Sequence, residues 1–219
     1  MPNLEWSKIA PHPSAIMIAG GVGTGKSALA GTHMEYAKTQ KLNLYSVGRK
    51  FPHTKVVGID YTPPVNSALY LDDAHLLGLY AHGADAKGVK VYDFLQRQKR
   101  HNQHSIVYTT QDTTGFTLRL LRMIDAICLF WPDMMIIELE RGLMATRYRK
   151  AMRAMGDAEV GKVWIQHRNP EDKTEVIEEV YSFNLPSWWT DDISTGYAQA
   201  KPLKRYNDNI FVKIVRNFG

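Results

Sequence analysis

The chain of 219 residues is long enough for one well-buried domain with a modest appendage, and its 44% hydrophobic and 22% charged residues are ordinary for a globular protein. No apolar run is long enough to cross a bilayer, no secretory signal opens the sequence, and the single cysteine, Cys128, excludes an internal disulfide, so we expect a cytoplasmic protein that does not itself span a membrane. The net charge of +5 favours a polyanionic partner without identifying one.

The N-terminal part predicts an irregular lead-in over residues 1–14, a buried strand over 15–19 and then a phosphate-binding loop. The loop satisfies G-x-x-x-x-G-K-[ST], in which glycines turn backbone N–H groups toward a polyanion, Lys26 reaches the β- and γ-phosphates and the Ser27 hydroxyl ligates Mg²⁺. A helix from Ser27 to about Thr39 directs its positive dipole end at the same phosphates. The motif therefore predicts binding of ATP with Mg²⁺ by Gly20, Gly21, Val22, Gly23, Thr24, Gly25, Lys26, Ser27 and Ala28.

The next elements lead to an acidic strand end. Residues 42–47 predict a second strand and 55–59 a short third, and the apolar residues 68–71 predict a strand that runs into Asp72 and Asp73. ATPases with a phosphate-binding loop place their second acidic motif at such a strand end, where Asp72 can hold Mg²⁺ together with Ser27 and Asp73 can deprotonate the attacking water. The structural alternative is a helix cap or a loop pair of aspartates.

Residues 89–100 predict a helix after a glycine-containing loop, and 105–109 predict a strand that closes on Gln111. An amide at this strand end can sense the γ-phosphate or hold the lytic water. A short helix over 118–124 and a strand over 126–131 follow. The alternation of strands and helices predicts an α/β fold, a mainly parallel sheet with helices on both faces, whose chemistry belongs at the carboxyl ends of the strands.

The C-terminal part predicts packing elements. Residues 133–155 are rich in methionine and predict a helix, or a helix pair broken near Gly142; 162–166 and 175–183 predict a hairpin, and a short helix begins near Thr190. We therefore expect one ATPase domain over residues 1–200, with its core at about 14–131 and a C-terminal helix and hairpin at 133–200, followed by a basic tail at 201–219.

Four segments together resemble the FtsK–HerA superfamily of DNA-pumping ATPases, and most of all the genome-packaging ATPases of membrane-containing viruses, archaeal ones included. These segments are Gly20–Ser27, Leu69–His75, Ile106–Gln111 and Leu118–Asp125. The resemblance implies a RecA-like P-loop NTPase core that hydrolyses ATP with Mg²⁺ and works as a ring homo-oligomer, a hexamer or pentamer, on double-stranded DNA. It also implies a host-cytoplasmic or virion-associated protein that meets a capsid or membrane-vertex protein. Asp73 departs from the glutamate of the family, which leaves the general base open.

The resemblance further implies an arginine supplied to each site by the neighbouring subunit, for which we favour Arg100 over Arg97, Arg119 and Arg122. A motor that passes any sequence contacts DNA mainly at phosphates. The candidates for that contact, each with an ordinary solvated surface as its structural alternative, are Lys87, Lys90, Arg147, Arg149 and Lys150.

Other functions remain open at this point. A small-molecule kinase shares the phosphate-binding loop but has no need of an aspartate pair followed by a strand-terminal glutamine. A nucleotide switch or assembly protein would bind ATP and hydrolyse it slowly, without an effect of DNA. A related mobile-element or conjugative DNA-pumping ATPase is the nearest alternative among motors.

Overall fold

The computed structural model describes residues 1–47, 50–58, 61–74, 99–114, 116–132, 134–140, 142–157, 159, 161–172 and 174–190. By its internal contacts the chain divides into two units, Met1–Pro186 and Ser187–Gly219. The sheet, its covering helices and the predicted nucleotide site all belong to the first unit. Among the described residues, no helix combines the length and the apolar character needed to cross a membrane.

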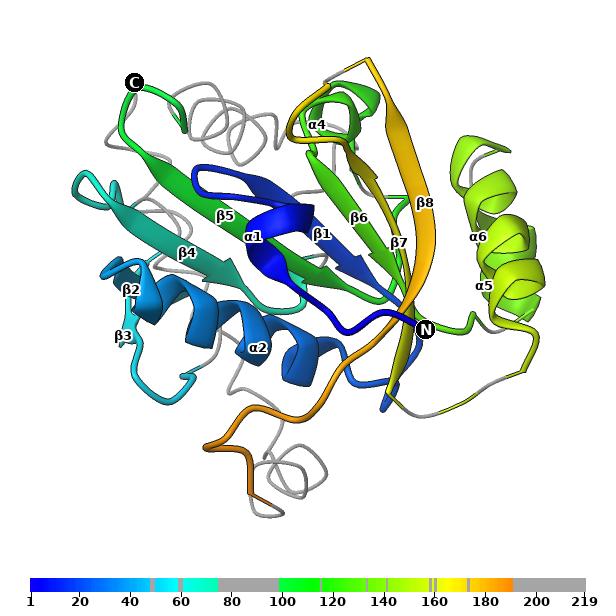
Figure 1. The fold of residues 1–219 in the computed structure, drawn as a ribbon, viewed down its shortest axis with the longest axis horizontal. Coiled ribbons are helices and arrows are strands. Elements are labelled where there is room, and N and C mark those ends of the chain that lie inside the picture. Colours follow the sequence, from blue (N-terminus) through cyan, green and yellow to red (C-terminus); the bar gives the residue numbers. More distant parts are fainter. Residues whose placement is uncertain are drawn as a thin grey trace, which may run out of the picture. The chain divides into compact units, whose positions relative to one another are not determined.

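The described strands form one sheet in the order β3-β2-β4-β5-β1-β6-β7-β8 (Figure 1). Neighbours from β3 to β6 pair in parallel, whereas β7 is antiparallel to β6 and β8 is antiparallel to β7. Because β5 lies between β1 and β4, the end of β5 separates the loop after β1 from the acidic end of β4. The strands are β1 (Ala15–Ala19), β2 (Asn43–Val47), β3 (Lys55–Val56), β4 (Ser67–Leu71), β5 (His104–Thr110), β6 (Ala126–Leu129), β7 (Lys162–Arg168) and β8 (Val176–Ser182).

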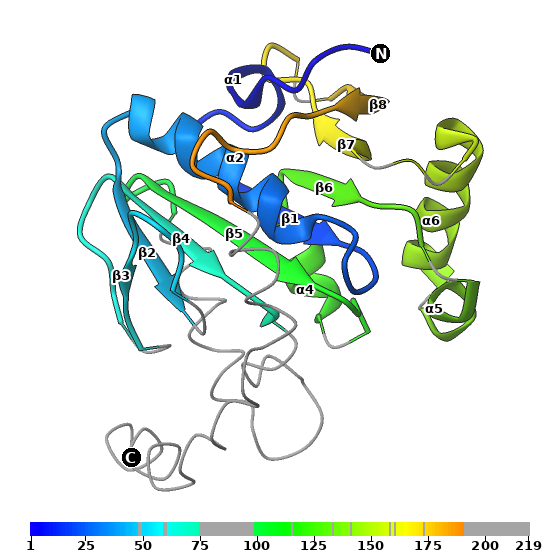
Figure 2. The ribbon, with the colours of Figure 1, turned by 90° about the horizontal axis from the view of Figure 1, so that it is seen from below.

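Helices cover both faces of the sheet, as Figure 2 shows for α2 and α4. On one face, α2 buries Leu29, Met34 and Ala37 against the parallel strands. On the other face, alternate residues of β1, β4 and β5 share one apolar core with α4 and α6, through side chains such as Met17, Leu69, Tyr108, Leu120 and Tyr148. The helices are α1 (Trp6–Ile9), α2 (Lys26–Thr39), α4 (Leu118–Arg122), α5 (Met134–Leu139) and α6 (Gly142–Met155).

Burial on both faces explains why the central strands read as continuous apolar runs. Strands β1, β4, β5 and β6 are buried along their whole length, and such strands have no solvent face to carry alternating polar residues. The predicted mainly parallel α/β sheet with helices on both faces is confirmed. The hairpin and the break in the helix pair near Gly142 are confirmed as well.

The lead-in over residues 1–14 is more ordered than predicted. It forms the helix α1, whose buried Trp6 donates its indole N–H to the Thr32 hydroxyl of α2 at 3.0 Å, and Asn3 pairs with Ser182 of β8. Prolines around so short a helix concealed it in the sequence. The helix predicted over 89–100 lies outside the described residues except for Lys99 and Arg100, which lie in a turn, and the tail 201–219 lies outside them entirely.

Candidate nucleotide site

The predicted phosphate-binding loop joins β1 to α2. Two of its glycines are required for different reasons, Gly25 for its backbone conformation and Gly20 for its close packing. Gly25, at φ +99°, directly precedes α2 in a left-handed conformation that favours glycine. Gly20 has no room for a side chain, because an added Cβ would lie 2.8 Å from Phe130 Cβ and 2.9 Å from Thr24 Oγ1. Val22 is exposed at the tip of the loop, and Ala28 is buried inside the first turn of α2.

Lys26 is held against the loop itself. Its ammonium group donates to the Gly20 carbonyl at 2.9 Å and to the Gly21 carbonyl at 2.6 Å, and the residue is only 8% exposed. Burial lowers the pKa of the Lys26 ammonium, and the carboxylates of Asp73 and Asp72 offset that shift in part. Phosphate oxygens accept from a cation more strongly than neutral carbonyls do, so the ammonium is poised to bind them.

Three side chains from three elements converge beside Lys26. The Ser27 hydroxyl, in the first turn of α2, donates to Asp72 Oδ1 at 3.4 Å. The Thr109 hydroxyl, near the end of β5, donates to the same Asp72 oxygen at 2.7 Å. Asp72 is 7% exposed and Thr109 only 2%, so this carboxylate is fixed in a largely dry position at the carboxyl end of β4.

Asp73 occupies a conformation that few residues adopt. Its φ of +46° lies in the left-handed region, which aspartate tolerates better than most side chains. Its backbone N–H donates to the Thr109 hydroxyl at 3.0 Å, so one hydroxyl contacts both acidic positions. The Asp73 carboxylate, together with that of Asp72, offsets part of the lowering of the Lys26 pKa.

Gln111 directly follows β5 and is half-buried beside the loop. The Gly20 N–H donates to the Thr110 carbonyl at 3.3 Å, which joins the start of the loop to the residue before Gln111. The Thr110 hydroxyl donates to the Asp112 carbonyl at 2.6 Å and so closes a tight turn around Gln111. Gln111 thus lies where β5 separates the loop from Asp72.

Thr109 is the site residue that the sequence analysis did not single out. A threonine inside an apolar strand is common and carries no motif of its own. The register does place it: Leu71 lies opposite Tyr108, so the residue after Tyr108 adjoins Asp72. Parallel pairing of β4 with β5, combined with the motif at Asp72, could have indicated the role of Thr109 from the sequence.

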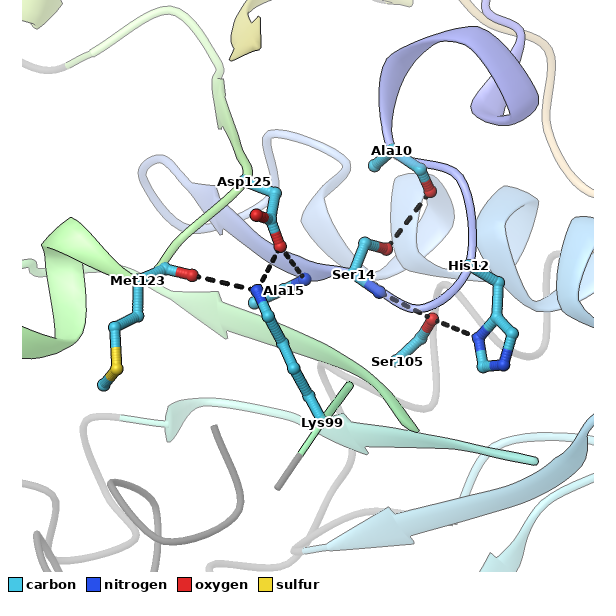
Figure 3. A network of polar contacts seen from close by, with 8 residues as sticks. All are labelled: Ala10, His12, Ser14, Ala15, Lys99, Ser105, Met123 and Asp125. Carbon is cyan, nitrogen blue, oxygen red and sulfur yellow. Dashed lines mark hydrogen bonds and ion pairs between the residues drawn. The ribbon is translucent and has the colours of Figure 1, made fainter. Parts of the chain in front are cut away.

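Arg100 lies at the opposite end of the sheet. It precedes β5, whose seven residues span about 20 Å, and its side chain is exposed. The turn is anchored by its neighbour Lys99, which donates to the Met123 carbonyl at 3.1 Å and forms an ion pair with Asp125 (Figure 3). The Asp125 carboxylate also accepts the Ala15 N–H at 2.8 Å. Arg100 therefore does not join the site of its own chain.

The candidate DNA contacts differ in their surroundings. Arg149 of α6 is exposed, whereas Arg147 is half-buried and donates to Gln166 at 2.7 Å. Lys150 forms an ion pair with Glu178 at 2.9 Å. The DNA-contact candidates Lys87 and Lys90 lie outside the described residues. Of the alternatives to Arg100 as the trans-acting arginine, Arg119 and Arg122 are exposed on α4 and Arg97 lies outside the described residues.

The oxygen ligands that Mg²⁺ prefers are present at this point. Mg²⁺ takes few protein ligands, one or two of them carboxylates, and completes its shell with water and substrate phosphates. A hydroxyl on Ser27 and a carboxylate on Asp72, 3.4 Å apart beside the loop, fit that donor set.

Solved structures share this fold. The genome packaging NTPase B204 from Sulfolobus turreted icosahedral virus 2, in complex with sulfate, gives a TM-score of 0.58 at 13% identity over 78% of this chain and 97% of that chain. EssC (ATPases 2 and 3) from Geobacillus thermodenitrificans gives 0.55 at 14% identity over 84% and 42%. The conjugation coupling protein TcpA of pCW3, with ATPγS, gives 0.54 at 14% identity over 83% and 62%. No protein-family model matches the sequence, and no curated protein matches it.

The fold and the loop together define the class of this chain, which has the fold of the P-loop ATPases. Its structural relatives include a viral packaging ATPase and a conjugation coupling protein. The resemblance that the motifs indicated, to FtsK–HerA ATPases, is therefore confirmed at the level of the fold. Since the identities are 12–14%, activity and partners are a separate question.

Proposed function

We propose that the chain hydrolyses ATP to move double-stranded DNA, as a ring of identical subunits that packages a viral genome. The observation that carries the proposal is the contact of Ser27 and Thr109 with one oxygen of Asp72, beside the phosphate-binding loop. This arrangement unites the parts that a P-loop hydrolase needs: a phosphate cradle, a place for a metal ion and polar groups at the γ-phosphate side.

The proposed chemistry assigns each side chain one task. Lys26 and the loop N–H groups bind the β- and γ-phosphates, and Gln111 orients a water against the γ-phosphorus. The water oxygen bonds to that phosphorus as the bond to the bridging oxygen breaks, which leaves ADP and phosphate, and Asp73 accepts the proton of the water. Mg²⁺, held by Ser27 and Asp72, would neutralise charge on the phosphates when bound.

Two observations support a ring. Arg100 is exposed at the end of the sheet opposite to the loop, so if it contributes to an ATP site, that site belongs to another copy. Its turn is also rigid, because Lys99 is buried and ion-paired with Asp125. A trans-acting arginine stabilises the charge that develops on the γ-phosphate and raises kcat by about 10³-fold or more. We propose a hexamer or a pentamer, in the host cytoplasm or with the virion.

Support for DNA as the partner comes from the relatives and from α6. B204 is described as a DNA-packaging ATPase and TcpA as a conjugation coupling protein. In this chain, Arg149 is exposed on α6, and the net charge is +5. Arg147 and Lys150 belong to intramolecular contacts, so we assign DNA contact on this helix to Arg149 first. Lys87 and Lys90 are further candidates, and a capsid or membrane-vertex protein is the proposed second partner.

The test is ATP turnover with and without double-stranded DNA, in the wild-type chain and in Lys26→Ala. We expect phosphate release that rises with DNA in the wild type and is lost in Lys26→Ala. An ATP turnover rate that does not change when DNA is added would indicate a nucleotide switch instead of a motor. Transfer of the γ-phosphate to a small molecule, with no release to water, would indicate a kinase.

A second comparison addresses α6. Arg149→Glu should weaken DNA binding. The slope of log affinity against log salt concentration should become shallower by the amount that corresponds to about one phosphate contact. Arg149→Lys, which keeps the charge, should bind like the wild type. An unchanged salt slope in Arg149→Glu would remove this helix face from the proposed DNA path.

A further inference from the structure

A buried carboxylate lies behind the Gln111 turn and has no task in the proposed chemistry. Glu140 follows α5 directly and is 8% exposed, and its partner Thr113 is 1% exposed. The Thr113 backbone N–H donates to Glu140 Oε1 at 3.0 Å, and the Thr113 hydroxyl donates to Glu140 Oε2. A carboxylate this deeply buried is costly unless its oxygens accept hydrogen bonds, and one residue satisfies both of them here.

The segment held in this way is the one that carries Gln111. The two residues that flank Thr113 bond to each other: the Asp112 carboxylate accepts the Thr114 N–H at 2.6 Å and the Thr114 hydroxyl at 2.8 Å. In addition, the Phe116 N–H donates to the Thr113 carbonyl at 3.0 Å. Together with the Thr110 hydroxyl, which donates to the Asp112 carbonyl across Gln111, these bonds give the turn its own hydrogen-bond network, and Glu140 connects that turn to the end of α5.

The helix pair continues the connection across the core. Tyr148 of α6 is buried near Glu140 and Asp112: burial raises the pKa of the Tyr148 hydroxyl, and the two carboxylates raise it further. The turn, the end of α5 and α6 therefore share one buried region on the α4 face of the sheet. A displacement of the turn would act directly on the end of α5, since the two hydrogen bonds from Thr113 to Glu140 join the turn to that helix end.

We infer that Glu140 is a positioning residue for Gln111: it fixes the turn after β5 against α5, and so ties the γ-phosphate side of the site to the α5–α6 pair. The inference rests on the proposed ATP hydrolysis. Loss of the Glu140 carboxylate would let the turn shift and displace the Gln111 side chain, while the phosphate-binding loop stays intact. Misplacement by about 1 Å costs up to about 10²-fold in rate.

The test compares kcat, KM and ADP affinity in Glu140→Ala and Glu140→Gln. Glu140→Ala should lower kcat roughly tenfold to a hundredfold, with KM and ADP affinity within about twofold of the wild type. Glu140→Gln should recover most of the rate, because its amide oxygen accepts the Thr113 N–H and its NH₂ donates to the Thr113 hydroxyl. Glu138→Ala, an exposed glutamate of α5, is the matched control and should match the wild type.

Three outcomes separate the possibilities. If Glu140→Ala melts at a lower temperature but keeps the wild-type kcat in the folded range, the role is structural only and the inference is overturned. If Glu140→Ala does not fold, Thr113→Val decides, because it removes one donor alone: a severalfold fall in kcat that Thr113→Ser restores supports the inference, and an unchanged kcat overturns it. A wild-type chain without ATP turnover overturns the proposed function itself, and this inference with it.

Discussion

Thr109 places one hydroxyl between two acidic residues of different proposed roles. It donates to Asp72 Oδ1 at 2.7 Å and accepts the Asp73 N–H at 3.0 Å. The first bond orients the carboxylate that faces Ser27, and the second holds Asp73 at φ +46°. The two acids therefore depend on one side chain that lies on a neighbouring strand.

Thr109→Val tests this dependence, since valine keeps the shape and the strand preference of threonine but has no hydroxyl. We expect kcat for ATP to fall about tenfold to a hundredfold, because both acids lose a fixed orientation. Thr109→Ser should retain most of the rate. Steady-state phosphate release checks both variants, and a Thr109→Val enzyme with wild-type kcat would contradict the assignment.

Gly20→Ala tests the close packing of the loop. The added methyl group would lie 2.8 Å from Phe130 Cβ, and overpacking of this kind costs about 1–3 kcal/mol. We expect weaker ATP binding and a lower melting temperature, measured by titration and by thermal unfolding.

Gly21→Ala is the matched control for that substitution. Among the described residues, its added methyl group would meet Thr24 Cγ2 alone, at an ordinary 3.7 Å. It should therefore bind ATP nearly as the wild type does. Equal losses in the two alanine variants would mean that contact with Phe130 does not set the geometry of the loop.

Local spacing explains which site residues the sequence could predict. Gly20 to Ser27 form one continuous motif, and Asp72 ends an apolar strand, so both are visible without knowing the register of the sheet. Thr109 is different because its role exists only once β4 and β5 pair with Leu71 opposite Tyr108. Glu140 depends on an even longer connection, from the end of α5 back to Thr113. Such contacts leave no trace in residue spacing.

At the scale of elements, the strands that are buried on both faces were the ones that the sequence predicted most closely. Strands covered on both faces are unbroken apolar runs, and β1, β4 and β5 were predicted to within about two residues. The helix α1 was missed because its four residues are too few to show a helical period. It forms because Trp6 is buried against α2, which is a tertiary contact.

The contact of α2 with α1 and β4 contains a buried histidine that predicts a pH dependence of stability. His33 of α2 is fully buried, hydrogen-bonds the Tyr70 hydroxyl at 2.9 Å and packs edge-on against Trp6. Burial lowers the pKa of His33 from 6.5 to about 3. Below pH 6.5 the His33 imidazole therefore binds a proton in the unfolded chain but stays neutral in the folded chain. The free energy of unfolding falls as the pH drops from 6.5 toward 3.

The expected loss from His33 is about 2 kcal/mol between pH 7.5 and pH 5. Urea unfolding at the two pH values should show it in the wild type and in His101→Gln, an exposed histidine that serves as the control. In His33→Gln, which cannot titrate, the loss should shrink by that amount. The same pH sensitivity in His33→Gln and the wild type would contradict this account of the α2 contact.

At the scale of the whole molecule, the ends of the sheet have separate proposed roles. The phosphate-binding loop, Asp72 and Gln111 lie at the carboxyl ends of the parallel strands, and Arg100 lies beyond the amino end of β5. A site completed by Arg100 therefore requires a neighbour that presents its opposite end, which is a head-to-tail contact. Such contacts form a ring when the rotation between neighbours closes, and the proposed ring is that case.

Mixing two inactive variants tests that arrangement. Lys26→Ala and Arg100→Ala should each lose ATP turnover alone. In an equal mixture, about a quarter of the interfaces combine an intact Lys26 with an intact Arg100 from the neighbour, so activity should return in part. A mixture that stays as inactive as its components, or an Arg100→Ala chain with full activity, would remove Arg100 from the proposed site.

The central claim is that the γ-phosphate of ATP lies among Lys26, Ser27, Asp72 and Gln111. A structure of the chain with Mg²⁺ and a slowly hydrolysed ATP analogue tests it most directly. We predict that the Lys26 ammonium leaves the Gly20 and Gly21 carbonyls for the phosphates, that Ser27 and Asp72 lie on the metal ion, and that Gln111 reaches the γ-phosphate or its water. A nucleotide bound elsewhere, or a metal ion held away from Ser27 and Asp72, would contradict the claim.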